Sequence, residues 1–162
     1  MISAIVAMSK NRVIGRNGMI PWRIKGEQKR FKELTTGNVI IMGRKSYDEI
    51  GHPLPNRNTV LISRSKKVET ENCHTVSTPF EALEYLRGCD KNIYVAGGAS
   101  VYKDFMPFVD RIYLTVVDLE IPDGDRFFPE FEREFEVVDS QRVEGEIPYT
   151  YYIYDRKIIA KS

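Results

Sequence analysis

The sequence predicts an α/β fold with a mixed, mainly parallel central sheet of about eight strands, flanked by helices and ending in an antiparallel hairpin at one edge. From residue 2 to residue 117, apolar runs of strand length alternate with helical patterns, an order typical of parallel strands joined by helices. These runs are apolar at nearly every position, as in strands covered on both faces. The last two strands follow each other without an intervening helix, so we expect them to pair antiparallel.

The first 63 residues contain three of the predicted strands. Residues 9–23 are expected to form a long loop, because they contain Gly15, Asn17, Gly18 and Pro21. Loops of that length are often functional lids. The other expected elements are a strand at 2–8, a helix at 25–36 that ends before Gly37, a strand at 39–42, a helix at 44–50, a loop at 52–58 and a strand at 59–63.

The rest of the chain begins with a polar segment at residues 66–72. Pro79 occupies the first turn of a predicted helix, where proline is well tolerated. The expected elements are a helix at 79–86, a strand at 92–96, a helix from Gly97-Gly98 to about residue 105, a strand at 111–117, an acidic loop at 118–125 and two strands near 135–140 and 149–154.

The composition is that of an ordinary globular domain, with 42% hydrophobic and 29% charged residues in a chain of 162. We therefore expect one domain over residues 1–162. The chain has no apolar run of the ~18 residues that a membrane span needs. Residues 1–8 are mostly apolar and contain no basic residue, so we do not expect them to be a signal peptide. Cys73 and Cys89 fit no metal or redox spacing, and two histidines are too few for a histidine-based metal site. These features predict a cytoplasmic protein with reduced cysteines and neither a metal nor a membrane partner.

Basic residues are concentrated near the N-terminus. Residues 1–57 contain 11 Lys and Arg against 4 Asp and Glu, whereas the other residues contain 13 against 19. A solvated basic face explains this pattern, and so does a site for anionic small molecules. Nucleic acid is disfavoured, because the basic residues are scattered among apolar segments and no recognition motif accompanies them.

Glu27 is the most informative single residue. On the predicted helix it shares one face with Phe31 and Leu34 at i, i+4 and i+7 spacing. An acidic residue also suits the first turn of any helix. The alternative is a carboxyl group in an apolar pocket, where burial raises its pKa and suits it to protonating a nitrogen heterocycle.

Several segments that follow strands have the residues expected of a nucleotide phosphate site. Gly97-Gly98 allows close backbone approach before a helix, although the run does not match G-x-G-x-x-G. Two further segments place a cation beside a hydroxyl at the end of a strand, and they are Gly43-Arg44-Lys45-Ser46 and Ser63-Arg64-Ser65. Alternatively, each of these three segments is an ordinary tight turn with no ligand.

Arg57 and Trp22 each follow a rigid segment. Arg57 comes after the run Pro53-Leu54-Pro55-Asn56, and a rigidly held guanidinium is suited to binding a carboxylate through two hydrogen bonds. Trp22 follows Pro21, where it either fills the core or anchors a water through its indole N–H.

A series of motifs occurs along nearly the whole chain in one order. They are Asn11-Arg12-Val13-Ile14-Gly15, Pro21-Trp22, Ile41-Met42-Gly43-Arg44-Lys45, Ile50-Gly51-His52-Pro53-Leu54-Pro55-Asn56-Arg57, Gly97-Gly98 with Val101-Tyr102, Tyr113-Leu114-Thr115, Asp123-Gly124-Asp125 and Phe128-Pro129. In this order and at this spacing, the chain resembles the bacterial dihydrofolate reductases from end to end.

The resemblance implies NADPH-dependent reduction of 7,8-dihydrofolate to 5,6,7,8-tetrahydrofolate, with hydride transfer to C6 and protonation at N5. It implies catalytic roles for Glu27, for Thr115, which supports the carboxylate, and for Trp22, which helps to hold a water. The substrate-binding residues that it implies are Ile5, Ala7, Glu27, Gln28, Phe31, Ile50, Leu54, Arg57 and Thr115.

The resemblance also implies an NADPH site in which Arg64 reads the 2′-phosphate and a cis peptide joins Gly97 to Gly98. Residues 9–23 would form the mobile lid, braced by the loop at 118–125, and the family usually works as a monomer. The cofactor-binding residues that it implies are Ala7, Ile14, Gly15, Gly43, Arg44, Lys45, Ser46, Ser63, Arg64, Ala96, Gly97, Gly98, Ala99, Ser100, Val101 and Tyr102.

Two departures from the common bacterial pattern concern antifolate binding. Glu27 and Gln28 stand where many members carry Asp and an apolar residue, and Lys25-Gly26-Glu27-Gln28 resembles the trimethoprim-insensitive reductases. Ala96 replaces a bulkier aliphatic residue beside the usual inhibitor site. We expect weak inhibition by trimethoprim with methotrexate-type binding retained.

Two alternative functions stay open at this point. The pyrimidine reductase of riboflavin synthesis shares this architecture and the use of NADPH, and substrate choice separates the two. A nucleotide-binding module without catalysis would bind NADPH, show no turnover and be indifferent to Glu27→Ala.

Overall fold

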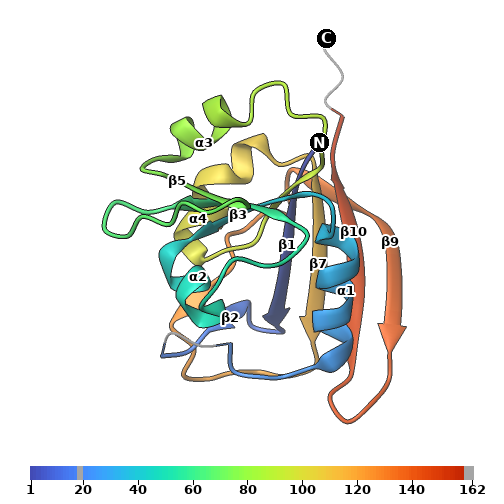
Figure 1. The fold of residues 1–162 in the computed structure, drawn as a ribbon. Coiled ribbons are helices and arrows are strands. Elements are labelled where there is room, and N and C mark those ends of the chain that lie inside the picture. The colour runs from blue at the N-terminus through green and yellow to red at the C-terminus, as the bar shows by residue number, and fades with distance from the viewer. Residues whose placement is uncertain (18–19, 159–162) are drawn as a thin grey trace.

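An eight-stranded sheet forms the centre of the molecule (Figure 1). The computed structural model describes residues 1–17 and 20–158, so Gly18 of the expected loop lies outside the described residues. In sheet order the strands are β5 (Cys73–Val76), β4 (Asn58–Ile62), β3 (Val39–Gly43), β6 (Ile93–Val95), β1 (Ile2–Ser9), β7 (Arg111–Val117), β10 (Tyr149–Arg156) and β9 (Phe135–Val143).

The pairing pattern confirms the predicted mixed, mainly parallel sheet. Each neighbouring pair from β5 to β7 is parallel. Strand β10 is antiparallel to both β7 and β9, so the last two strands form the expected edge hairpin.

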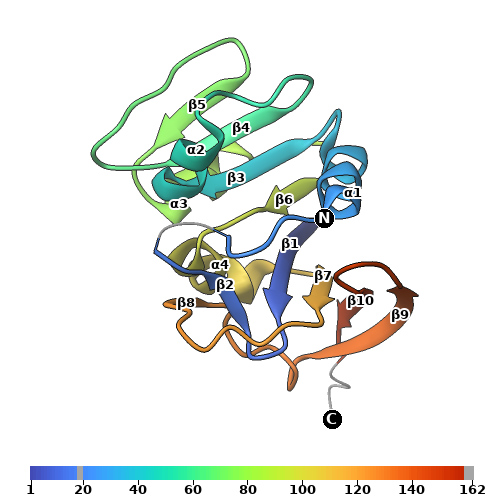
Figure 2. The ribbon, with the colours of Figure 1, turned by 90° about the horizontal axis from the view of Figure 1, so that it is seen from below.

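Helices cover both faces of the sheet. They are α1 (Lys25–Thr35), α2 (Arg44–Ile50), α3 (Pro79–Tyr85) and α4 (Ala99–Phe105), followed by the short 3₁₀ helix η1 (Met106–Phe108). On β3, Ile40 and Met42 pack with apolar side chains of α1 and α2, whereas Val39 and Ile41 pack with those of α3 and α4. Figure 2 shows α1 and α4 on opposite sides of the sheet.

Among the described residues no helix is long and apolar enough to cross a membrane.

The helix ends follow the signals in the sequence. Pro79 begins α3, and the Thr78 hydroxyl accepts a hydrogen bond of 3.1 Å from the Glu81 backbone N–H, which is a standard N-cap. Helix α1 is followed by Gly37 in the left-handed region at φ +80°, where glycine carries no steric cost.

Three short strands lie where the sequence patterns indicate none. Strand β5 is a polar edge strand with only its two end residues buried, so it lacks an apolar run. In the small second sheet, β2 (Val13–Gly15) lies in the segment expected to be a loop, and β8 (Arg126–Phe127) directly follows the expected loop at 118–125. The prediction of a continuous loop over residues 9–23 is therefore wrong at residues 13–15, where burial of Val13 and pairing with β8 stabilise a strand.

The loop at 118–125 packs directly against the segment that contains β2. Asn11 Nδ2 donates to the Ile121 carbonyl at 2.9 Å, and Asn11 Oδ1 accepts from the Ile121 N–H at 3.0 Å. The Asn17 N–H donates to Asp125 Oδ2 at 3.0 Å. Gly124 lies against Val13 so closely that a Cβ atom there would be 2.9 Å from Val13 Cβ and nearer still to both methyl groups.

We predict that Gly124→Ala lowers the free energy of unfolding by about 1–3 kcal/mol, because the buried Val13 cannot move aside for the added methyl group. Urea unfolding followed by circular dichroism measures the change. Gly145→Ala is the matched control, since nothing lies within 4 Å of the Cβ position there. Equal stability for both variants would contradict the proposed close packing.

Candidate active site

A cavity of about 520 Å³ opens between α1, α2 and the central strands, within the range of roughly 300–1,000 Å³ typical of small-molecule sites. Its lining is mainly apolar, with a few polar and charged groups. The lining residues are Ile5, Val6, Ala7, Ile20, Trp22, Arg23, Ile24, Glu27, Gln28, Phe31, Lys32, Met42, Ser46, Glu49, Ile50, Leu54, Arg57, Ala96 and Tyr102.

Glu27 extends from the first turn of α1 into this cavity, with Phe31 one turn further along the same helix. The Thr115 hydroxyl donates a hydrogen bond to Glu27 Oε1. Thr115 is only 2% exposed and lies in the middle of the sheet, where β7 pairs with β1 and β10. The carboxyl group is therefore held by a buried residue in the middle of the sheet.

Burial gives this carboxyl group unusual acid–base properties. Loss of hydration raises the pKa of Glu27 from 4.5 to about 7, against the opposing positive charge of Arg30. Near neutral pH both the protonated and the ionised forms are then populated, as suits a group that donates a proton during a reaction.

Arg57 lines the same cavity and is held firmly by its neighbours. It is 7% exposed; Nε donates to the Pro55 carbonyl at 2.9 Å and Nη1 to Thr35 Oγ1 at 3.3 Å. Its Nη2 group has no hydrogen-bond partner within residues 1–17 and 20–158. Burial lowers the pKa of Arg57, which nevertheless stays a cation. The expected rigid guanidinium is thus present, with donor capacity left for a ligand.

The residues predicted to contact the substrate converge on this one cavity. The catalytic candidates Glu27 and Trp22 line it, and Thr115 lies behind the carboxylate that it contacts. The other predicted substrate residues, all of which line the cavity, are Ile5, Ala7, Gln28, Phe31, Ile50, Leu54 and Arg57.

The two predicted phosphate segments around Gly97 and Gly43 meet each other. The Gly43 N–H donates to the Gly97 carbonyl at 2.8 Å, and the peptide bond from Gly97 to Gly98 is cis, as the resemblance implies. A Cβ atom on Gly97 would lie 3.2 Å from Ser46 Oγ and 3.3 Å from the Tyr102 ring. Glycine therefore leaves a narrow space beside the start of α2.

The third phosphate segment is joined to the start of α2 by side chains. Arg44 Nη1 donates to Ser65 Oγ at 2.7 Å, and Arg44 Nε lies 3.4 Å from Asp48 Oδ2. The Ser63 hydroxyl accepts from the backbone N–H of Ser65, which turns the chain after β4. Lys45 and Arg64 are exposed on these two segments.

The predicted cofactor residues are more dispersed than the predicted substrate residues. Four of them, Ala7, Ser46, Ala96 and Tyr102, line the cavity. Tyr102 is buried and donates its hydroxyl to the Ile5 carbonyl at 2.7 Å, so this side chain joins α4 to β1. The members that lie outside the cavity are Ile14, Gly15, Gly43, Arg44, Lys45, Ser63, Arg64, Gly97, Gly98, Ala99, Ser100 and Val101. Ala99 and Ser100 line a separate surface depression beside β8.

Sequence reasoning does not identify seven of the cavity residues, which are Val6, Ile20, Arg23, Ile24, Lys32, Met42 and Glu49. Two of these residues could have been inferred from their positions in the sequence. Met42 directly precedes Gly43 at the end of a predicted strand, and Glu49 lies one helical turn beyond Ser46. Val6 and Lys32 lie in a predicted strand and a predicted helix, whereas Ile20, Arg23 and Ile24 come from a segment whose path the sequence patterns do not specify.

Comparisons with known proteins agree with this architecture. The family model described as dihydrofolate reductase matches residues 1–156. The chain is 43% identical to dihydrofolate reductase type A13 of Escherichia coli over 96% of its own length and 94% of that protein. It is 38% identical to dihydrofolate reductase of Bacillus subtilis (strain 168), over 100% of this chain and 98% of that one.

A solved structure supports the same assignment. Dihydrofolate reductase from Enterococcus faecalis, complexed with NADP(H) and RAB-propyl, superimposes with a TM-score of 0.88 at 30% identity, and the match covers 98% of this chain and 97% of that one. These findings favour a dihydrofolate reductase over a pyrimidine reductase or a module without catalysis. The chain belongs to the dihydrofolate reductase family and is, like its relatives, an oxidoreductase.

Proposed function

We propose that this chain reduces 7,8-dihydrofolate to 5,6,7,8-tetrahydrofolate with NADPH, as a single domain and a monomer. The observation that carries the proposal is Glu27, a carboxyl group that is hydrogen-bonded by Thr115 in an apolar cavity and has a pKa of about 7. Reduction of a C=N bond consumes one hydride and one proton, so the enzyme needs a proton source at neutral pH.

The residues around Gly97 fit a dinucleotide. A side chain at this position would fill the space beside Ser46. The cation Arg44 at the start of α2 donates a hydrogen bond to the Ser65 hydroxyl in the segment after β4, so these two segments lie side by side. We propose that Arg44, Lys45 and Ser46 hold the phosphates and that Arg64 reads the 2′-phosphate. The remaining predicted cofactor residues, Ile14, Gly15, Ser63 and Ala99–Val101 among them, would complete the site. When bound, NADPH supplies the hydride that is transferred to C6.

The cavity residues orient the other reactant. We assign Glu27 to the 2-amino group and N3 side of the pterin, and Arg57 to the α-carboxylate of the glutamate tail, where its remaining N–H donors suit a carboxylate. Phe31, Ile50 and Leu54 form the apolar wall between them. Trp22, also on the lining, would hold the water through which the Glu27 proton reaches N5.

We predict that Glu27→Gln lowers kcat/KM for dihydrofolate by roughly 10²- to 10⁴-fold, because the amide keeps the shape of the side chain but cannot deliver a proton. In the natural enzyme the rate should fall as pH rises above about 7, since the protonated carboxyl group is lost there. Loss of NADPH absorbance on adding dihydrofolate measures both effects.

The control for this experiment is Glu33→Gln, an exposed carboxyl group on the same helix, which should leave the rate unchanged. Full activity of Glu27→Gln, or NADPH binding with no turnover by the natural protein, would contradict the proposed function.

We predict that Arg64→Ala raises the KM for NADPH by roughly 3- to 10-fold and leaves the KM for NADH unchanged, because only NADPH carries the 2′-phosphate. Steady-state rates with both cofactors test this. Lys67→Ala removes an exposed cation from the same loop and should affect neither constant. A parallel rise of both KM values would exclude Arg64 as the reader of the 2′-phosphate.

We further propose that trimethoprim inhibits this enzyme weakly while methotrexate-type inhibitors bind. Glu27, Gln28 and Ala96 all line the cavity, so the small Ala96 side chain and the longer carboxylate change its shape where an inhibitor would lie.

Ala96→Ile should tighten trimethoprim binding by about 1–3 kcal/mol, or roughly 5- to 150-fold, by restoring apolar contact. Inhibition constants measure this, and a value for the natural enzyme as low as that of a sensitive bacterial reductase would refute the proposal.

A further inference from the structure

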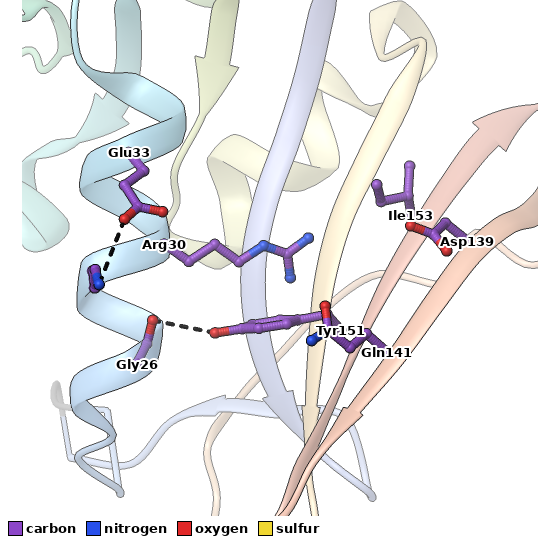
Figure 3. A pocket seen from close by; sticks show the side chains of 8 residues that line it. Gly26, Arg30, Glu33, Asp139, Gln141, Tyr151 and Ile153 are labelled. Atoms are coloured by element: carbon purple, nitrogen blue, oxygen red, sulfur yellow. Dashed lines mark hydrogen bonds and ion pairs between the residues drawn. The ribbon is translucent and has the colours of Figure 1, made fainter.

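A second groove lies behind α1, on the side away from the active-site cavity, with a volume of about 330 Å³ (Figure 3). Gly26 and Arg30 of α1 and Tyr151 of β10 line it. Glu27 follows Gly26 directly but lines the other cavity. Glu27 and Arg30, at i and i+3 on one helical turn, therefore line two different pockets.

The Arg30 side chain is held against the sheet by a contact with an aromatic ring. The central carbon of its guanidinium lies 3.7 Å from the centroid of the Tyr151 ring and 5.9 Å from that of Tyr113. Figure 3 shows the Arg30 side chain extending from the helix over the Tyr151 side chain. Such a stacked cation is attracted by the ring and loses side-chain mobility.

Tyr151 is in turn connected to the surroundings of Glu27 in two ways. Its hydroxyl donates to the Gly26 carbonyl at 3.2 Å, one residue before the carboxylate. In the sheet Tyr151 is paired with Thr115, the residue that donates to Glu27. Arg30 and Tyr151 thus join the first turn of α1 to the strands behind it.

We propose that Arg30 is a positioning residue for Glu27, which holds the first turn of α1 against β10 and places a fixed positive charge behind the carboxylate. This inference rests on the proposed function and extends it to a residue outside the active-site cavity.

Other charged or titratable groups line the same cavity as Glu27 or lie on the elements that adjoin it. Those on the cavity lining or on adjoining strands and helices are Arg23, Lys32, Glu49, Arg57, Tyr102 and Tyr149. The charge of Arg30 lowers the pKa of Glu27, whereas burial raises it. Removing the guanidinium should therefore raise this pKa and keep Glu27 protonated to higher pH.

The test compares Arg30→Met, which keeps an unbranched apolar stem, with Arg30→Lys, which keeps the charge. The Glu27 carboxyl carbon, labelled with ¹³C and assigned by its loss in Glu27→Gln, is titrated by NMR in each variant. We expect the titration midpoint to rise by roughly 0.3–0.7 pH units in Arg30→Met and to stay unchanged in Arg30→Lys. The pH at which kcat/KM for dihydrofolate begins to fall should rise by the same amount.

Lys29→Met is the matched control, because it removes the same charge from the neighbouring residue, which is 79% exposed in its side chain. Arg30→Gln serves as the neutral variant if Arg30→Met does not fold. An unchanged midpoint in the neutral variant, or an equal rise in Lys29→Met, would overturn the proposal. The NMR titration needs no turnover, so a natural enzyme inactive on dihydrofolate would refute the proposed function while leaving the role of Arg30 to be decided.

Discussion

The hydrogen bond from Thr115 to Glu27 is the contact on which the active site depends. It connects the first turn of α1 to the centre of the sheet, where β7 is paired on both sides. A carboxyl group in an apolar cavity would otherwise turn toward solvent, because desolvation opposes its charge. The donor keeps it in the cavity, and burial then brings its pKa to about 7. The position of Glu27 and its acidity thus have one physical origin.

The order of strands brings the second half of the site beside the first. Because β6 lies between β1 and β3, the Gly97-Gly98 turn that follows it meets the Gly43 turn that follows β3. Gly97 cannot carry a side chain without contacting Ser46 or Tyr102, and a Cβ atom on Gly43 would lie 3.0 Å from a methyl group of Val101. The space that we propose for the dinucleotide and the apolar cavity that we propose for its reaction partner are consequently neighbours, as is usual at the carboxyl ends of strands in open α/β sheets.

Much of this arrangement could be predicted from the sequence. Apolar runs locate the central strands, and the i, i+4 spacing of Glu27 and Phe31 correctly indicates a carboxyl group facing a cavity. Strand β5 could not be predicted, since it is a short polar edge strand that depends on pairing with β4 rather than on a pattern of its own. Strands β2 and β8 could not be predicted either, since each is short and is stabilised by pairing with a segment more than 100 residues away. The contact of Arg30 with Tyr151 was missed for the same reason, because 121 residues separate partners that only the completed sheet brings together.

A crystal structure of the enzyme with NADP⁺ and folate would show directly whether Glu27 binds the pterin. We expect the pterin to lie in the cavity with its 2-amino group and N3 within hydrogen-bond distance of the Glu27 carboxylate, and with C6 beside the nicotinamide ring. Thr115 should keep its hydrogen bond to the same carboxylate. A pterin bound with this edge turned away from Glu27, or bound outside the cavity, would contradict the account.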